Sequence, residues 1–160
     1  KEALAQYSPS GVHTCYNMLN PTSGYKLPKT FPYQNYDGLM TAASEDGIGT
    51  VGIRILAGGA LSGSMERHPI AQQNVAPIAT SSTFREDVSR ALTFEFLVNE
   101  GFVDNLAEAS IRFAISNDNL DTALIGLSNF DQLKQAVNYT NKGVLPKEAL
   151  DKISGIWAVS

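Results

Sequence analysis

Hydrophobic residues recur at helical spacing in several segments of the chain, and polar residues fill the positions between them. The pattern predicts helices over 36–45, 83–100, 105–117, from Ser128 or Asn129 to Gly143, and over 147–157, with the end of another in 1–7. Thr83 is a candidate N-cap, and Asn105 and Glu108 have the spacing of a capping box. In the helix over 83–100 the residues expected to face inward are Val88, Leu92, Phe96 and Leu97, and in the helix over 105–117 they are Ala107, Ile111, Ala114 and Ile115. In the helix that ends at Gly143 they are Leu133, Ala136, Val137 and Thr140.

Three short apolar runs alternate with these helices and predict strands over 12–17, 49–56 and 122–125. Because the runs are apolar on both faces, they favour a parallel sheet covered by helices, which is an α/β fold. Residues 57–63 are rich in glycine and are expected to form a flexible loop, while 64–82 are expected to be irregular. The length of the chain predicts a single domain over 1–160.

Composition narrows the classes of partner. The net charge is -4 and the twelve Lys and Arg residues are scattered, which argues against a nucleic-acid partner. Cys15 is the only cysteine, so an intrachain disulfide is excluded and a reducing compartment is expected. The sequence has no apolar run of membrane-spanning length and no signal peptide, so we expect a cytoplasmic protein without a membrane partner. The first residue is Lys1 rather than Met, which suggests an upstream segment.

The segment from Leu120 to Val137 predicts a buried strand, a glycine turn and a helix. A strand that opens onto a helix N-terminus is typical of an anion site, because free backbone N–H groups and the positive helix end point at one place. Gly126, Ser128 and Asn129 are therefore candidate phosphate-binding residues. The alternative is an ordinary turn that needs small residues only for packing.

Two further positions are candidates for chemistry. Arg54 falls inside an apolar run, and a buried arginine needs a carboxylate, a phosphate or a ligand as partner. His13 and Cys15 alternate onto one face of a strand, but a third ligand is missing, so we expect no metal site. Both side chains are expected to line the inner face of the sheet.

Three segments in order resemble the sixth, seventh and eighth strands of the aldo-keto reductase family, each with the loop that follows it. The matching phrases are Val12-His-Thr-Cys-Tyr-Asn-Met-Leu-Asn-Pro21, Ile53-Arg-Ile-Leu-Ala-Gly-Gly-Ala-Leu-Ser-Gly63 and Ala123-Leu-Ile-Gly-Leu-Ser-Asn-Phe-Asp-Gln-Leu133. The resemblance implies part of a TIM (β/α)8 barrel, with about three parallel strands, covering helices, and a site at the C-terminal ends of the strands.

The resemblance also implies a cofactor, NADP or NAD, and a small carbonyl substrate. Backbone at Ala57, Gly58, Gly59 and Leu61 would contact the pyrophosphate, and Gly126, Ser128 and Asn129 the adenosine phosphate. Gln132 and Gln135 would reach the adenine and its ribose, and Tyr16 and Asn17 would lie near the nicotinamide. No Arg or Lys lies in 127–131 to pair with a 2′-phosphate, although Lys134 is one turn away, so the choice between NADP and NAD stays open.

The family's catalytic Asp, Tyr, Lys and His lie on its first four strands, for which the chain has no counterpart. The expected function is therefore that of the cofactor-binding C-terminal half of a reductase of aldehydes and ketones. The alternative is a truncated relative that self-associates and acts as a binding module, or catalyses an isomerase or cyclase type of reaction through His13, Tyr16 or Arg54. A regulatory role is a third possibility, by fold-level analogy with reductase-like channel subunits. Three strands leave two open edges, so we expect a homo-oligomer or pairing with the N-terminal half of a barrel.

Overall fold

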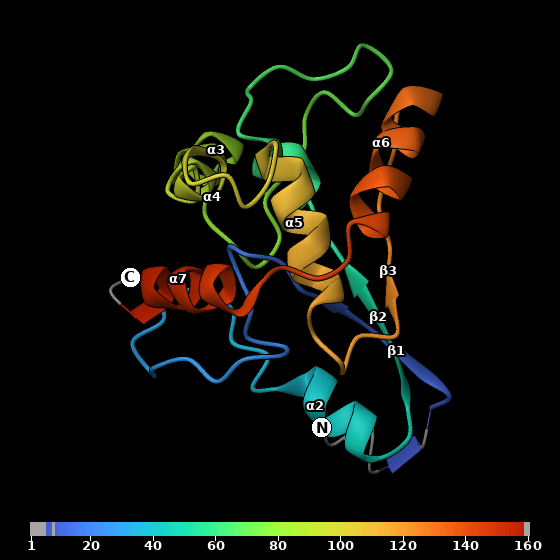
Figure 1. Cartoon of the computed structure of the whole chain (residues 1–160). Coiled ribbons are helices and arrows are strands. Elements are labelled where there is room, and N and C mark those ends of the chain that lie inside the picture. Colours follow the sequence, from blue (N-terminus) through green and yellow to red (C-terminus); the bar gives the residue numbers. More distant parts are fainter. Residues whose placement is uncertain (1–5, 8, 159–160) are drawn as a thin grey trace.

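The computed structural model describes residues 6–7 and 9–158, and its centre is a three-stranded parallel sheet (Figure 1). The strands are β1 (Gly11–Cys15), β2 (Gly49–Ile53) and β3 (Thr122–Ala123), in the order β1-β2-β3. This confirms the predicted α/β architecture of about three parallel strands. Of the helix end expected over 1–7, only residues 6 and 7 lie within the described part, and they are helical.

The strands are shorter than predicted, and β3 is the shortest. Five residue pairs join β1 to β2, from Gly11 opposite Gly49 to Cys15 opposite Ile53, but only two pairs join β2 to β3. A side-chain contact supports this narrow ladder, because the Asp121 carboxylate accepts a hydrogen bond from the Thr50 backbone N–H at 2.7 Å. The sheet is thus held firmly on one side and by few bonds on the other.

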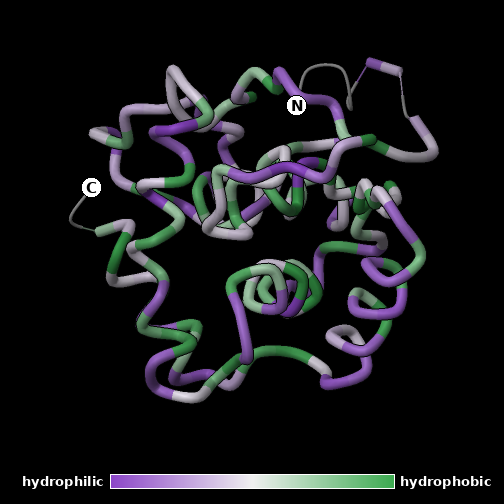
Figure 2. Tube along the Cα trace, turned by 90° about the horizontal axis from the view of Figure 1, so that it is seen from above, coloured by the Kyte–Doolittle hydropathy of each residue, from purple (hydrophilic) through white to green (hydrophobic). Residues whose placement is uncertain are grey.

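Helices follow each strand, and in the view of Figure 1 they lie to the left of the sheet and above it. They are α2 (Leu39–Glu45), the 3-10 helix η1 (Ala57–Ser62), α3 (Phe84–Leu92), α4 (Phe96–Asn99), α5 (Leu106–Ile115), α6 (Phe130–Asn141) and α7 (Lys147–Ala158). α5 runs through the middle of the molecule (Figure 2), and eight of its ten residues are buried. No helix within the described residues has both the length and the apolar character needed to cross a lipid bilayer.

Side-chain caps begin three of the helices as the sequence predicts. The Thr83 side chain accepts from the Glu86 backbone N–H, and the Glu86 carboxylate completes a capping box at the start of α3. Asn105 accepts from the Glu108 N–H at 2.9 Å. At α6 the cap is Asn129, the second of the two candidates.

The single helix predicted over 83–100 is wrong, because it is divided into α3 and α4. Between them, the backbone N–H groups of Thr93, Phe94 and Glu95 donate to carbonyls three residues earlier, which tightens the turn. The tightening turns the Phe94 side chain into the core, where it is 2% exposed, and leaves Leu92 exposed. Burial of a large aromatic ring therefore outweighs continuation of the helix.

The expected inward face of α6 is also wrong. Ala136 is buried, but Leu133 and Val137 are 43% and 50% exposed, and Thr140 is exposed as well. A polar contact links the cap of α5 to α6, since the Asn105 side-chain amide donates to the Tyr139 hydroxyl at 2.9 Å. The apolar stripe of this helix faces outward.

An aromatic cluster joins the first strand to the last helix. Tyr16 stacks on Phe113 with ring centroids 5.2 Å apart, and Trp157 meets Phe113 edge-on at 5.8 Å. The Trp157 indole N–H donates to the Met18 carbonyl at 2.8 Å, a contact that spans 139 positions of sequence. These contacts fix the chain where it leaves β1 and so define one side of the C-terminal edge of the sheet.

Candidate functional site

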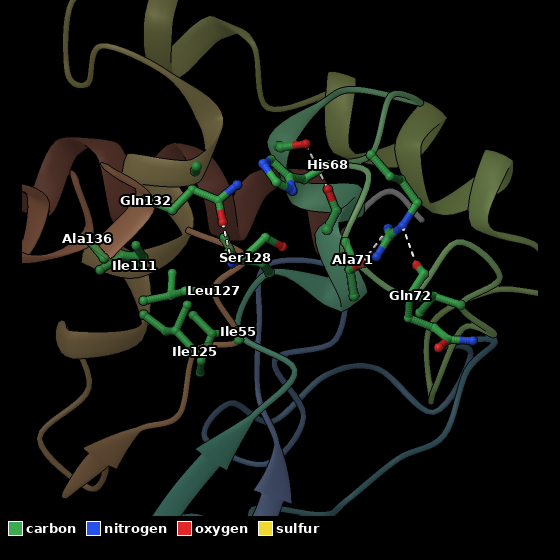
Figure 3. A pocket seen from close by; sticks show the side chains of 18 of the residues that line it. Ile55, His68, Ala71, Gln72, Ile111, Ile125, Leu127, Ser128, Gln132 and Ala136 are labelled. Carbon is green, nitrogen blue, oxygen red and sulfur yellow. Dashed lines mark hydrogen bonds between the residues drawn. The ribbon is translucent and has the colours of Figure 1, made fainter. Parts of the chain in front are cut away.

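A pocket of about 920 Å³ opens beyond the C-terminal ends of β2 and β3 (Figure 3). Its size is that of a cofactor or drug-sized ligand site. One wall is built by the residues after β2, by η1 and by the loop that follows it. The other wall is built by residues 124–128 and by α6, with Ile111 of α5 between the two.

The chain turns sharply where it leaves β2. Arg54, Ala57, Gly58 and Gly59 all have left-handed backbones, with φ values of 60°, 48°, 69° and 106°. Residues in this region are costly unless the surroundings hold them, and such strain clusters at functional sites. The segment expected to be a flexible loop is therefore a kinked 3-10 helix with a defined shape.

The backbone of this turn is already engaged in its own hydrogen bonds. The N–H of Ala57 donates to the Arg54 carbonyl at 2.8 Å, and the N–H groups of Gly59 and Leu61 both donate to the Leu56 carbonyl. Ala57 and Leu61 are buried, whereas Gly58 and Gly59 line the pocket. An anion that approaches this wall meets side chains as well as backbone.

Arg54 lies one residue beyond β2 and lines the pocket, which corrects the expectation of an arginine buried within the strand. It is half-buried, and no described carboxylate forms an ion pair with it. Its Nη2 lies 3.5 Å from the Ala76 carbonyl oxygen, at the limit of a hydrogen bond. The guanidinium is thus held loosely at the pocket edge.

A second guanidinium comes from the loop after η1. Arg67 donates from Nη1 to the Gly58 carbonyl and from Nε to the Gln72 carbonyl, both at 2.7 Å. A Cβ on Gly59 would lie 3.0 Å from Arg67 Nη1, and one on Gly58 would lie 2.9 Å from Arg54 Nη1. The two glycines therefore leave the room that the two guanidinium groups occupy.

Sequence reasoning missed Arg67 and its neighbour His68, which also lines the pocket (Figure 3). The available signal was the occurrence of two basic residues just after a glycine-rich turn. The His68 Nδ1 accepts from the Ile70 backbone N–H at 3.3 Å, which orients the ring within the loop.

The opposite wall is lined by amides and apolar groups. The Gln132 Oε1 accepts from the Ser128 N–H at 2.7 Å (Figure 3). The Asn129 Oδ1 accepts from the Gln132 N–H at 2.8 Å. Gln135 lines the same face one turn further on. A Cβ on Gly126 would meet no atom within 4 Å, so the chain leaves open space at this position.

Several residues expected at the site do not line the pocket. Asn129 acts as a helix cap, and Asn17 is 1% exposed with both ends of its amide bonded to backbone. Tyr16 lies in the aromatic cluster, where burial raises the pKa of its hydroxyl well above the usual value. His13 on β1 is exposed and Cys15 is buried, and neither residue lines the pocket. Within the described residues, no three His, Cys, Asp or Glu side chains gather as metal ligands would.

Comparison with known proteins relates the chain to one protein family and to solved structures of similar fold. The model of the aldo/keto reductase family matches residues 14–158. The fold is similar to solved structures of the aldo-keto reductase AKR11C1 from Bacillus halodurans, in its holo and apo forms, each with a TM-score of 0.62 and 18% sequence identity. The matches cover 99% of this chain but only 45% and 47% of those chains, so this chain spans less than half of their length. Comparison with curated proteins gave no match.

Proposed function

Because the chain belongs to the aldo/keto reductase family, we propose that its pocket binds NAD(P)H within a barrel that reduces aldehydes or ketones. The observation that carries this proposal is the position and lining of the pocket. It lies beyond the C-terminal ends of parallel strands, where barrel enzymes of this architecture place their sites. It also pairs a wall that holds two guanidinium groups with a wall that begins at a helix N-terminus.

The residues of the two walls suit different parts of a dinucleotide. Arg54 and Arg67 would contact the pyrophosphate, because guanidinium groups bind phosphate oxygens through charge-assisted hydrogen bonds. Gly126 and Ser128 would lie against the adenosine ribose, and the amides of Gln132 and Gln135 would reach ribose hydroxyls or the adenine edge. When bound, NAD(P)H supplies a hydride to a carbonyl carbon.

We assign the proton-transfer groups of that reaction to elements beyond this chain's three strands. Tyr16 is fully buried, and its hydroxyl accepts a hydrogen bond from the Asn117 side chain at 3.2 Å. Burial raises the pKa of this phenol well above its usual value, and the side chain does not line the pocket. His13, the other polar candidate on β1, is exposed outside the pocket. The chain's own contribution in this proposal is to bind and orient the cofactor.

The test is a fluorescence titration of the 160-residue chain with NADH and NADPH, followed by a panel of aldehydes and ketones. Gly126→Val should lower the affinity at least about tenfold, because the valine side chain fills space that the ribose needs. Gly155→Val in α7 is the matched control, since a Cβ there also meets no atom within 4 Å and the residue lies outside the pocket. Unchanged affinity in the Gly126 variant would contradict the proposal. Affinity without turnover is the result expected of this chain alone, because the proposal assigns the proton-transfer groups to other elements of the barrel. In a full-length form, turnover would favour a complete reductase, and affinity without turnover would favour the binding-module alternative.

A second proposal concerns self-association, and one specific feature of α6 favours it. Phe130, Leu133 and Val137 line a shallow depression on its outer face and are 66%, 43% and 50% exposed. Apolar side chains that share one helix face are typical of an interaction surface. We propose that two copies associate through this face. Sedimentation of the wild-type chain should show a dimer that Val137→Glu converts to a monomer, and a wild-type monomer would refute the proposal.

A further inference from the structure

Positive charge is distributed unevenly around the pocket. Arg54 and Arg67 both lie on the wall that follows β2, and Glu66 is the one acid among the described lining residues. On the opposite wall, the lining residues from Leu124 to Ser128 and those of α6 carry no charge. The pocket therefore offers cations at one end only.

The N-terminus of α6 has fewer free backbone N–H groups for an anion than a helix N-terminus usually has. The N–H groups of Ser128 and Gln132 already donate to side-chain oxygens of Gln132 and Asn129. Asp131 adds a negative charge in the first turn, where it opposes the positive end of the helix dipole. A phosphate placed there would compete with these internal bonds and with a carboxylate.

Lys134 does not supply the missing cation. It lies on the outer face of α6, in the depression lined by Phe130 and Leu133, rather than on the face that carries Gln132 and Gln135. Its ammonium group lies 4.7 Å from the centre of the Phe130 ring and 3.8 Å from the Asp131 carboxylate. Both contacts are made on the side of the helix away from the pocket.

From this asymmetry we infer that the pocket selects NAD(H) over NADP(H), an inference that rests on the proposed function. The pyrophosphate would lie at Arg54 and Arg67, which leaves the adenosine end against the α6 wall. Gln132 and Gln135 amides match ribose hydroxyls, which both donate and accept hydrogen bonds. A 2′-phosphate would meet no cation on that wall and would lose hydration without compensation.

The experiment compares the dissociation constants of NADH and NADPH by fluorescence, which requires no turnover. The wild-type chain should bind NADPH about tenfold more weakly, the ratio expected when one charge-assisted hydrogen bond is missing. Gln135→Arg should shift the ratio of the two dissociation constants about tenfold in favour of NADPH, because it places a cation beside the ribose. Asn138→Arg is the matched control, since it adds the same charge to the outer face of the helix and should leave the ratio unchanged.

A further variant tests which end of the dinucleotide lies at the cationic wall. Arg54→Gln should weaken both cofactors by the same factor, because both carry the pyrophosphate. Equal or tighter binding of NADPH by the wild-type chain would overturn the inference and leave the proposed function intact. Failure of both nucleotides to bind would instead defeat the proposed function, and this inference with it.

Discussion

The side-chain amide of Asn17 donates a hydrogen bond to the carbonyl oxygen of Arg54, with a nitrogen–oxygen distance of 2.9 Å. Asn17 follows β1 and Arg54 follows β2, so the bond joins two neighbouring strands at their C-terminal ends. Arg54 has a left-handed backbone that needs such support. The residue that the family resemblance places near the nicotinamide thus also fixes the start of the cationic pocket wall.

Replacing Asn17 with Asp tests this support. The carboxylate can still accept from the N–H groups of Leu19 and Asn20, but it cannot donate to Arg54. We expect the free energy of unfolding to fall by about 1–3 kcal/mol, the usual effect of leaving a buried polar group without its partner. Urea unfolding measures the change. Asn35→Asp, at an exposed turn, should have little effect, and an equal loss in both variants would contradict the assignment.

Gly58, which lines the pocket, and Gly47, which does not, form a matched pair that tests how tightly the pocket wall is packed. Both have a φ of 69°, so an alanine is strained equally at either position. At Gly58 the new Cβ would also lie 2.6 Å from Val75 Cγ1 and 2.9 Å from Arg54 Nη1, whereas at Gly47 it meets no atom within 4 Å. We expect Gly47→Ala to cost about 1 kcal/mol and Gly58→Ala about 2–3 kcal/mol, because overpacking adds to the strain. Similar losses in urea unfolding would show that the guanidinium position is not constrained by this glycine.

Glu108 anchors an ionic network behind the pocket. Its carboxylate is fully buried and contacts the Arg112 guanidinium at 2.9 Å and the Lys142 ammonium at 2.7 Å. Glu108→Gln removes the negative charge and should destabilise the fold by about 2–3 kcal/mol, since buried partners are left uncompensated. Asp104→Asn is the control, because Asp104 bonds the same lysine but is exposed, and it should leave the unfolding midpoint nearly unchanged. An unchanged free energy of unfolding in the Glu108→Gln variant would show that the network does not stabilise the fold.

The buried phenol of Tyr16 predicts a loss of stability in alkali. Burial raises its pKa well above the ordinary value, so the folded chain keeps a proton that the unfolded chain releases above about pH 10. Stability contributed by this group is complete below that pH and declines as the pH rises further. Tyr16→Phe should reduce the slope of unfolding free energy against pH between about pH 10 and 11, compared with Tyr7→Phe at an exposed position.

Other groups titrate in that range with the same sign. A hydrogen bond to Asp104 raises the pKa of Lys142, and one to Glu100 raises the pKa of Lys152. Because these lysines are present in both variants, their contribution cancels in the comparison of slopes. Identical slopes for Tyr16→Phe and Tyr7→Phe would show that the buried phenol does not control alkaline unfolding.

Local rules predicted the parts of the fold that depend on local chemistry. Thr83, Asn105 and Asn129 cap their helices because a cap needs only a side-chain oxygen and an N–H group three residues on. The order of strands and helices also follows from the spacing of apolar runs. The phrases at 12–21, 53–63 and 123–133 identified the family.

The misplaced features depend on distant partners. β2 ends at Ile53 because the backbone turns at Arg54. The Arg54 carbonyl accepts a hydrogen bond from Asn17, which lies 37 positions earlier in the sequence. Leu133 and Val137 have the spacing of core residues, but spacing does not tell a core face from a surface that meets another molecule. Arg67 could not be placed at the pocket because its position depends on how the loop folds back onto Gly58.

The two walls of the pocket follow β2 and β3, and only two residue pairs join these strands, Val51 with Thr122 and Gly52 with Ala123. A molecule that reaches from one wall to the other would tie these strands together more strongly than their own ladder does. Ligand binding should therefore stabilise the pairing of β2 with β3, and this edge of the sheet should become rigid only when the pocket is filled.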